Sequence, residues 1–162
     1  MATVHCERSV DLNLHTLHPG DVVCAERGAR LETLLGSCVS IVMTDKRRTI
    51  GAMCHIVHVN PNKETVNING TCGEGAIALL YAALRQRSLN PQMCEAYVYG
   101  GGNMFPKLFK QAHVGENNSR WALQRLSSDG VRVLFHDLGG TAYRRLTWTV
   151  GDEAPRVQAV AV

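Results

Sequence analysis

Hydrophobic and polar residues follow two different periods along this chain, and each period predicts one kind of element. Residues 39–43 are nearly continuous in apolar, β-branched character, as expected for a strand covered on both faces. A charged turn at residues 44–49 follows, and residues 50–59 predict a second strand. Residues 143–150 alternate between apolar and polar, which predicts a strand with one buried face. Shorter apolar runs predict further strands at residues 21–25, 93–99, 131–136 and 156–162.

Two segments have the longer period of an amphipathic helix. The first spans residues 74–88, with its apolar residues on one face. The second runs to Ser128, and Asn117, Asn118 or Ser119 can cap its start. Strands outnumber helices, so we expect an α+β fold, a single layered domain of mostly antiparallel strands with two main helices.

The predicted elements do not begin at the first residue. Residues 1–20 have no period and predict an extended N-terminal lead-in, so the domain is expected to span residues 21–162. Residues 60–75 are polar and contain Gly and Pro, which predicts a loop that rims a site.

Composition narrows the classes of function. The 162 residues are 45% hydrophobic and 19% charged, enough for the core of one globular domain. A net charge of +3, with no basic run longer than residues 46–48, argues against nucleic-acid binding. No apolar run approaches the ~18 residues of a membrane span, and no signal core is present at the N-terminus. We therefore expect no membrane insertion, a cytoplasmic location and reduced cysteines.

Cys38 is the candidate for chemistry because of the residues around it. Gly36 and Ser37 place it in a tight turn at the head of a strand, where backbone N–H groups can stabilise an oxyanion. A histidine on the next strand would be its base, and both His55 and His58 are candidates. These two positions of a strand point to opposite faces, so only one can face the thiol. The residues alone leave that choice open.

Two other features compete with this pair. A metal site would need Cys38, Cys54, His55 and His58 as its ligands. Successive side chains of a strand point to opposite faces, so these residues are not expected to meet at one point, and we expect no metal. Three glycines at residues 100–102 directly follow a predicted strand. They indicate a close backbone approach, either to a ligand or to another strand.

Several segments together resemble the CheD family of bacterial chemoreceptor glutamine deamidases. Residues 33–39 are TLLGSCV, and a histidine follows the cysteine by seventeen residues, within GAMCH at residues 51–55. Weaker similarity continues through GGGNMF at 100–105, VGENN at 114–118 and DLGG at 137–140. The resemblance covers nearly the whole chain after residue 20.

The resemblance implies a role for each motif residue. It makes Cys38 the catalytic nucleophile, His55 the catalytic histidine and Thr33 the third catalytic residue. The substrate and oxyanion region is expected to include Gly36, Ser37, Gly101, Gly102 and Asn103. The implied reaction hydrolyses selected glutamine side chains to glutamate through a cysteine thioester, without a metal or organic cofactor.

The resemblance also implies partners and a fold. The substrates would be the cytoplasmic helices of chemoreceptors, and a CheC-type phosphatase is a further expected partner. The alternative is a non-catalytic or weakly catalytic protein that mainly docks to such a phosphatase and to receptors. An amine that intercepts the thioester would give transglutamination, and hydrolysis of receptor methyl esters is a further alternative reaction. The implied fold is similar to that of cytotoxic necrotizing factor deamidases.

Overall fold

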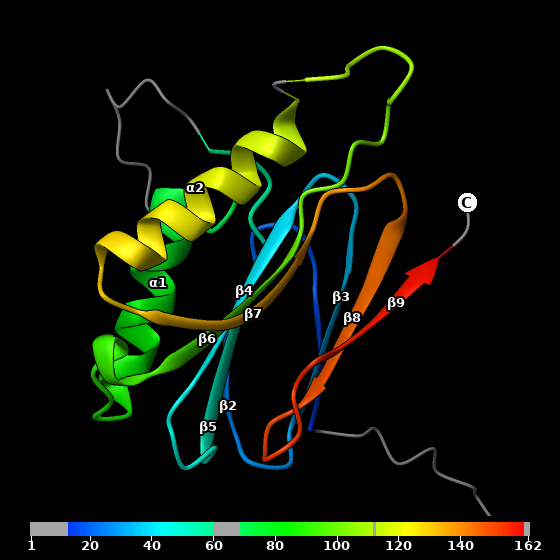
Figure 1. Cartoon of the computed structure of the whole chain (residues 1–162). Helices are drawn as coiled ribbons and strands as arrows, with labels where there is room; N and C mark the ends of the chain where they lie inside the picture. The colour runs from blue at the N-terminus through cyan, green and yellow to red at the C-terminus, as the bar shows by residue number, and fades with distance from the viewer. Residues whose placement is uncertain (1–12, 60–68, 112, 161–162) are drawn as a thin grey trace, which may run out of the picture.

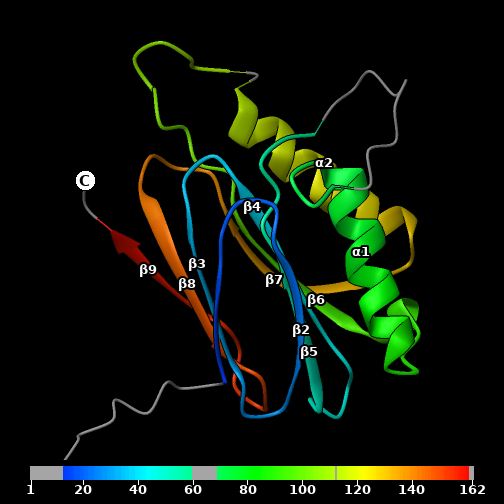
Figure 2. The same ribbon diagram turned by 180° about the vertical axis from the view of Figure 1, so that it is seen from behind.

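The computed structural model describes residues 13–59, 69–111 and 113–160, which form three stacked layers (Figures 1 and 2). A sheet of order β1-β3-β8-β9 packs on a sheet of order β2-β5-β4-β6-β7, and two helices cover the other face of the second sheet. Five of the seven strand pairings are antiparallel, which confirms the predicted class. The elements are β1 (Leu14–Leu17), β2 (Val22–Glu26), β3 (Arg30–Leu35), β4 (Val39–Thr44), β5 (Ile50–Cys54), α1 (Gly73–Gln86), the 3-10 helix η1 (Pro91–Met93), β6 (Glu95–Gly100), α2 (Val114–Ser128), β7 (Arg132–Leu138), β8 (Tyr143–Thr149) and β9 (Arg156–Val160).

Strand β4 lies at the centre of the five-stranded sheet, and all six of its residues are buried. Val42 faces the other sheet, where it packs in one core with Leu146 and Trp148 of β8. Ile41 and Met43 face the helices and belong to a second core. The strand predicted to be covered on both faces is therefore confirmed. Within the described residues, no helix is long and apolar enough to cross a membrane.

Two neighbouring strands of the first sheet were not predicted, and one of them is its edge strand. Residues 14–17, expected in the lead-in, form β1, which pairs in parallel with β3. Strand β1 buries only Leu17 and is held mainly by backbone hydrogen bonds, which leave no pattern of side chains. Strand β3 buries Leu31, Thr33 and Leu35 in alternation, and its single buried threonine obscured the apolar period.

Two boundaries differ from the prediction by three residues or more. Helix α2 begins at Val114, about one turn earlier than expected, because His113 caps it and its Nδ1 accepts a hydrogen bond from the Glu116 N–H at 3.2 Å. Strand β5 ends at Cys54, and in the residues described after it Ile56 forms an isolated bridge with Val39 and His58 forms one with Cys72.

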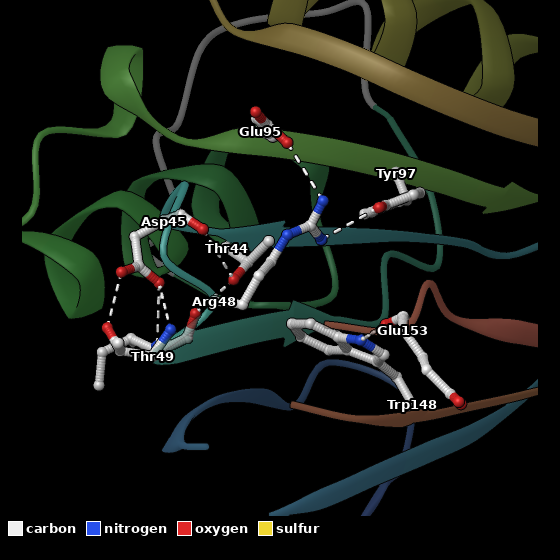
Figure 3. A network of polar contacts seen from close by, with 9 residues as sticks. Thr44, Asp45, Arg48, Thr49, Glu95, Tyr97, Trp148 and Glu153 are labelled. Carbon is white, nitrogen blue, oxygen red and sulfur yellow. Dashed lines mark hydrogen bonds and ion pairs between the residues drawn. The ribbon is translucent and has the colours of Figure 1, made fainter. Parts of the chain in front are cut away.

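The turn between β4 and β5 holds the two strands in register (Figure 3). The Asp45 carboxylate accepts hydrogen bonds from the backbone N–H groups of Thr49 at 2.8 Å and Ile50 at 3.0 Å, and from the Thr49 hydroxyl at 2.6 Å. A slip by one residue would break these bonds and turn every side chain to the other face. Because Cys38 precedes the far end of β4, this turn decides which residues after β5 lie beside it.

Arg48 ties the same turn to β6 (Figure 3). Its guanidinium donates to the Glu95 carboxylate at 3.2 Å and to the Tyr97 hydroxyl at 3.0 Å. The Arg48 and Glu95 side chains are each 16% exposed, so water screens this ion pair less than one at the surface. The turn is thus anchored to strands on both sides of β4.

Candidate active site

Cys38 and His55 lie on the same face of the five-stranded sheet. The bridge between Val39 and Ile56 sets an antiparallel register in which Cys38 is opposite Val57. His55 is two residues from Val57, so its side chain shares the face of Cys38 as a diagonal neighbour. Such neighbours have Cα atoms about 7–8 Å apart, a separation that an aromatic side chain can span.

The Thr33 hydroxyl connects His55 to the other sheet. Its Oγ1 atom lies 2.7 Å from His55 Nδ1 and donates to the carbonyl of Leu17 at 2.8 Å. A hydroxyl has one proton, so once that proton is donated to Leu17 it accepts the second bond from Nδ1–H. This arrangement leaves the lone pair on His55 Nε2, the form that a general base requires.

His55 is 3% exposed, and its surroundings favour the neutral ring. Burial lowers the pKa of the imidazole, and His18 lowers it further, whereas the charge of Asp21 raises it. The backbone of His55 is fixed as well, because its N–H donates to the Asp21 carbonyl at 3.1 Å and its carbonyl accepts from the Gly20 N–H at 2.9 Å. The ring is therefore held in place as a neutral base.

Cys38 lies where the chain crosses from β3 in one sheet to β4 in the other, and it lines a cavity of about 580 Å³. Burial raises the pKa of its thiol, and its own backbone N–H partly offsets this rise. The thiol is therefore protonated at neutral pH and needs a base to become a nucleophile. Among the described residues, no carbonyl and no side chain of another residue accepts from the backbone N–H of Ser37 or Cys38, so both groups can donate to an oxyanion.

The glycine segment at residues 100–102 packs against the turn that carries the thiol. The Gly101 N–H donates to the Cys38 carbonyl at 2.8 Å, and the Gly102 N–H donates to the Gly36 carbonyl at 2.9 Å. Gly100 has a φ of +114°, and a Cβ atom there would collide with the Cys38 carbonyl. The close approach indicated by the sequence is thus to the Cys38 turn.

Four of the five residues expected in the substrate and oxyanion region line the cavity, and Gly101 is not among the lining residues. The N–H groups of Gly101 and Gly102 are already paired, and the Asn103 N–H donates to the Gly140 carbonyl at 2.8 Å. The Asn103 side-chain amide donates to the Phe109 carbonyl. This segment therefore shapes the cavity, and the free N–H groups lie in the Cys38 turn. The four lining residues are Gly36, Ser37, Gly102 and Asn103.

Asn118 is a polar residue beside the site that the sequence analysis considered only as a helix cap. It lies on α2, is 1% exposed, and its Nδ2 donates to the Ser37 carbonyl at 3.0 Å and to the Val57 carbonyl at 3.0 Å. In the sequence, the only other indication was that Asn118 lies in the VGENN segment, to which the family resemblance assigned no function.

The other candidate ligands do not gather around the thiol. His58 is exposed, and burial raises the pKa of Cys54 to about 12. Within residues 13–59, 69–111 and 113–160, no three His, Cys, Asp or Glu side chains are placed to hold a metal. In the same residues Cys38 makes no hydrogen bond to His55, a contact that is often long in enzymes without substrate.

Apolar side chains rim the cavity on the segment before α2. Phe105 and Phe109 line it and are 63% and 53% exposed, and Leu108 between them is 74% exposed. Lys107 and Lys110 on the same segment are also exposed. Contiguous exposed apolar residues commonly mark a protein-binding surface.

Comparison with known proteins identifies a family for this chain. Residues 59–158 match the family model described as CheD chemotactic sensory transduction. A protein named probable chemoreceptor glutamine deamidase CheD 2 from Albidiferax ferrireducens is 30% identical over 84% of this chain and 81% of its own length. A protein named probable chemoreceptor glutamine deamidase CheD from Pseudomonas syringae pv. syringae is 31% identical over 84% and 78%. Because each alignment covers 84% of this 162-residue chain, it spans residues 33–58, which carry Thr33, Cys38 and His55.

Similarity to solved structures is weaker. A crystal structure of a Neisseria meningitidis protein of family DUF152 has a TM-score of 0.48 and 13% identity, over 81% of this chain and 65% of the other.

Proposed function

The chain belongs to the CheD family, and from this we propose that it is a protein-glutamine deamidase that hydrolyses glutamine side chains of chemoreceptors. The observation that carries the proposal is the Thr33–His55 contact at 2.7 Å, with the Thr33 proton donated to Leu17. It presents a neutral imidazole with Nε2 free, on the same face as a thiol that lines a cavity. A buried neutral base on the same face as a half-buried thiol suits nucleophilic catalysis.

The proposed first half-reaction forms a thioester. His55 Nε2 takes the proton of the Cys38 thiol, and the thiolate attacks the carbon of the glutamine carboxamide. The resulting oxyanion accepts hydrogen bonds from the free N–H groups of Ser37 and Cys38. The imidazolium then protonates the amide nitrogen, the C–N bond breaks, and ammonia leaves.

The second half-reaction reverses these roles with water. His55 removes a proton from water, whose oxygen attacks the thioester carbon. The new tetrahedral intermediate collapses, breaks the C–S bond and releases glutamate, and the imidazolium returns a proton to the Cys38 sulfur. Thr33 would keep Nδ1–H bound through both steps, which stabilises the imidazolium and its orientation. No proposed step draws on a metal or an organic cofactor.

The proposed substrate is a macromolecule that reaches the thiol past the apolar rim. Phe105, Leu108 and Phe109 give a helix of a receptor an apolar surface next to the cavity, and the glutamine side chain would enter beside Gly36. A CheC-type phosphatase is a second proposed partner for this rim. The proposed place of action is the cytoplasm, and the proposed layered fold is similar to that of cytotoxic necrotizing factor deamidases.

The proposal is tested by ammonia release from a purified receptor cytoplasmic domain. We expect release with the wild-type chain and none with Cys38→Ala, while Cys72→Ala, which alters a thiol at the start of α1, should keep the activity. Equal release by wild type and Cys38→Ala would contradict the assignment. No release by wild type, with a receptor or phosphatase pull-down that survives Cys38→Ala, would favour the docking alternative.

A further inference from the structure

The side chain of Asn118 joins the two halves of the proposed catalytic pair. One Nδ2–H bond reaches the Ser37 carbonyl, one residue before Cys38, and the other reaches the Val57 carbonyl, two residues after His55. The residue lies on α2, which is distant in sequence from both segments. Within the part of the chain that the structure describes, Asn118 is the residue whose side chain bonds to both of these carbonyls.

The bond to Ser37 acts on the peptide that holds the nucleophile. The Ser37 carbonyl and the Cys38 N–H belong to one peptide unit, which is trans, so they point in opposite directions. Asn118 binds the carbonyl end, and no other residue of the described chain accepts from the N–H end. The Cys38 N–H therefore points away from the Ser37 carbonyl and Asn118, and Cys38 itself lines the cavity.

We propose that Asn118 is a positioning residue, which orients the Ser37–Cys38 peptide and polarises its N–H toward the oxyanion. This inference rests on the proposed acyl transfer to Cys38. A hydrogen bond accepted by a carbonyl makes the N–H of the same peptide a stronger donor, because bonds in a chain polarise one another. A fixed donor also costs no reorganisation when the oxyanion forms.

The unpaired Oδ1 atom of Asn118 indicates that the two hydrogen bonds made by Nδ2 are the reason for an asparagine at this position. Its Oδ1 is buried and meets no hydrogen-bond donor in the part of the chain that the structure describes. An unsatisfied buried carbonyl is unfavourable, so an apolar residue here would avoid that cost. The hydrogen bonds from Nδ2 to the Ser37 and Val57 carbonyls compensate for the cost of this unpaired oxygen.

The test separates acyl transfer from simple thiol reactivity. The full-length chain is treated with 4-nitrophenyl acetate, which forms an oxyanion when it acylates Cys38. A second sample is treated with iodoacetamide, which alkylates the thiol by displacement at carbon and forms no oxyanion. Both rates are read at Cys38 by peptide mass spectrometry. The variants are Asn118→Ala and Asn118→Asp, and Asn117→Ala is the matched control because its side chain is exposed one residue away.

We expect Asn118→Ala and Asn118→Asp to slow acylation about 10- to 100-fold, with alkylation within about twofold of wild type, because loss of oxyanion stabilisation affects only the first reaction. Asn117→Ala should change neither rate. If Asn118→Ala does not fold, as judged by thermal unfolding, Asn118→Ser is measured instead.

Three results would overturn the inference: unchanged acylation in the Asn118 variants, an equal loss of both reactions, or no acylation of Cys38 in the wild type. Acylation by the ester without ammonia release from glutamine substrates would contradict the proposed function alone.

Discussion

Thr33 Oγ1 lies 2.7 Å from His55 Nδ1, and this bond crosses from β3 of one sheet to the segment after β5 of the other. Because the same hydroxyl donates to the Leu17 carbonyl, the imidazole has only one tautomer available to it. The stacked sheets are thus more than a scaffold for the proposed chemistry. They bring together a histidine and the hydroxyl group that decides which of its ring nitrogens carries the proton.

Replacing Thr33 by valine should weaken the base without changing the shape of the site. Thr33→Val leaves His55 Nδ1 and the Leu17 carbonyl buried without this partner, and we expect kcat to fall about 10- to 100-fold. We expect the free energy of unfolding to fall by about 1–3 kcal/mol. Thr33→Ser keeps the hydroxyl and should restore most of kcat. Wild-type kcat in Thr33→Val, measured by ammonia release, would remove Thr33 from the mechanism.

The pH dependence of activity and of alkylation should show that Cys38 and His55 are both neutral in the free enzyme near neutral pH. Burial lowers the pKa of His55 from its ordinary 6.5, so the unprotonated base persists to lower pH and kcat/KM should rise with pH through an apparent pKa below 6.5. Burial raises the pKa of Cys38 above its ordinary 9.0, so alkylation of the free enzyme by iodoacetamide should increase up to pH values above 9.0. An alkylation rate already at its plateau near neutral pH would indicate a preformed thiolate instead.

The β4–β5 turn should control stability more than its exposed position suggests. Asp45→Ala removes the acceptor of three hydrogen bonds, and we expect the free energy of unfolding to fall by about 1–3 kcal/mol. Burial opposes the charge of Asp45, but bonds from Thr49 and Ile50 outweigh it and lower the pKa. The contribution of Asp45 is therefore present above its ordinary pKa of 3.8 and is lost as the pH falls below it.

The control for this turn is Asp152→Asn, which removes an exposed ion pair with Arg27. It should leave the chemical denaturation midpoint almost unchanged, since exposed pairs contribute little. Equal effects of the Asp45 and Asp152 substitutions would refute the proposed importance of the turn.

The apolar rim should affect protein substrates and not small ones. Leu108→Glu places a charge on a side chain that is 74% exposed, so the fold should tolerate it while KM for a receptor domain rises about tenfold. Acylation of Cys38 by 4-nitrophenyl acetate should stay at the wild-type rate. Met93→Glu, at a 60% exposed position on η1, is the matched control and should change neither value. An unchanged KM in Leu108→Glu would argue against receptor docking at this rim.

The sequence predicts this fold where side chains carry the pattern. The continuous apolar run of β4 and the alternation of β8 are both confirmed, because burial on two faces or one face leaves a direct trace in residue type. Strand β1 left no such trace, since its parallel pairing with β3 rests on the backbone. The predicted start of α2 was wrong because the residue that caps it is His113, and histidine is not a common N-cap residue.

The candidate site was predictable only in part for a related reason. Local features picked out Cys38, and its turn does line the cavity. The choice of His55 rested on resemblance, and the structure shows it buried against Thr33, with His58 exposed. Asn118 could not be found from the sequence, because its partner Ser37 is 81 residues away and the contact depends on how α2 packs over the sheet.

The central claim is that Cys38 and His55 convert glutamine to glutamate, and the most direct measurement is site-resolved mass spectrometry of a receptor cytoplasmic domain. The domain is incubated with wild type, Cys38→Ala, His55→Ala or the control His58→Ala. Glutamine-to-glutamate conversion with wild type and His58→Ala, and none with the other two variants, is the predicted result. Conversion at the same sites and the same rate with Cys38→Ala would contradict the account.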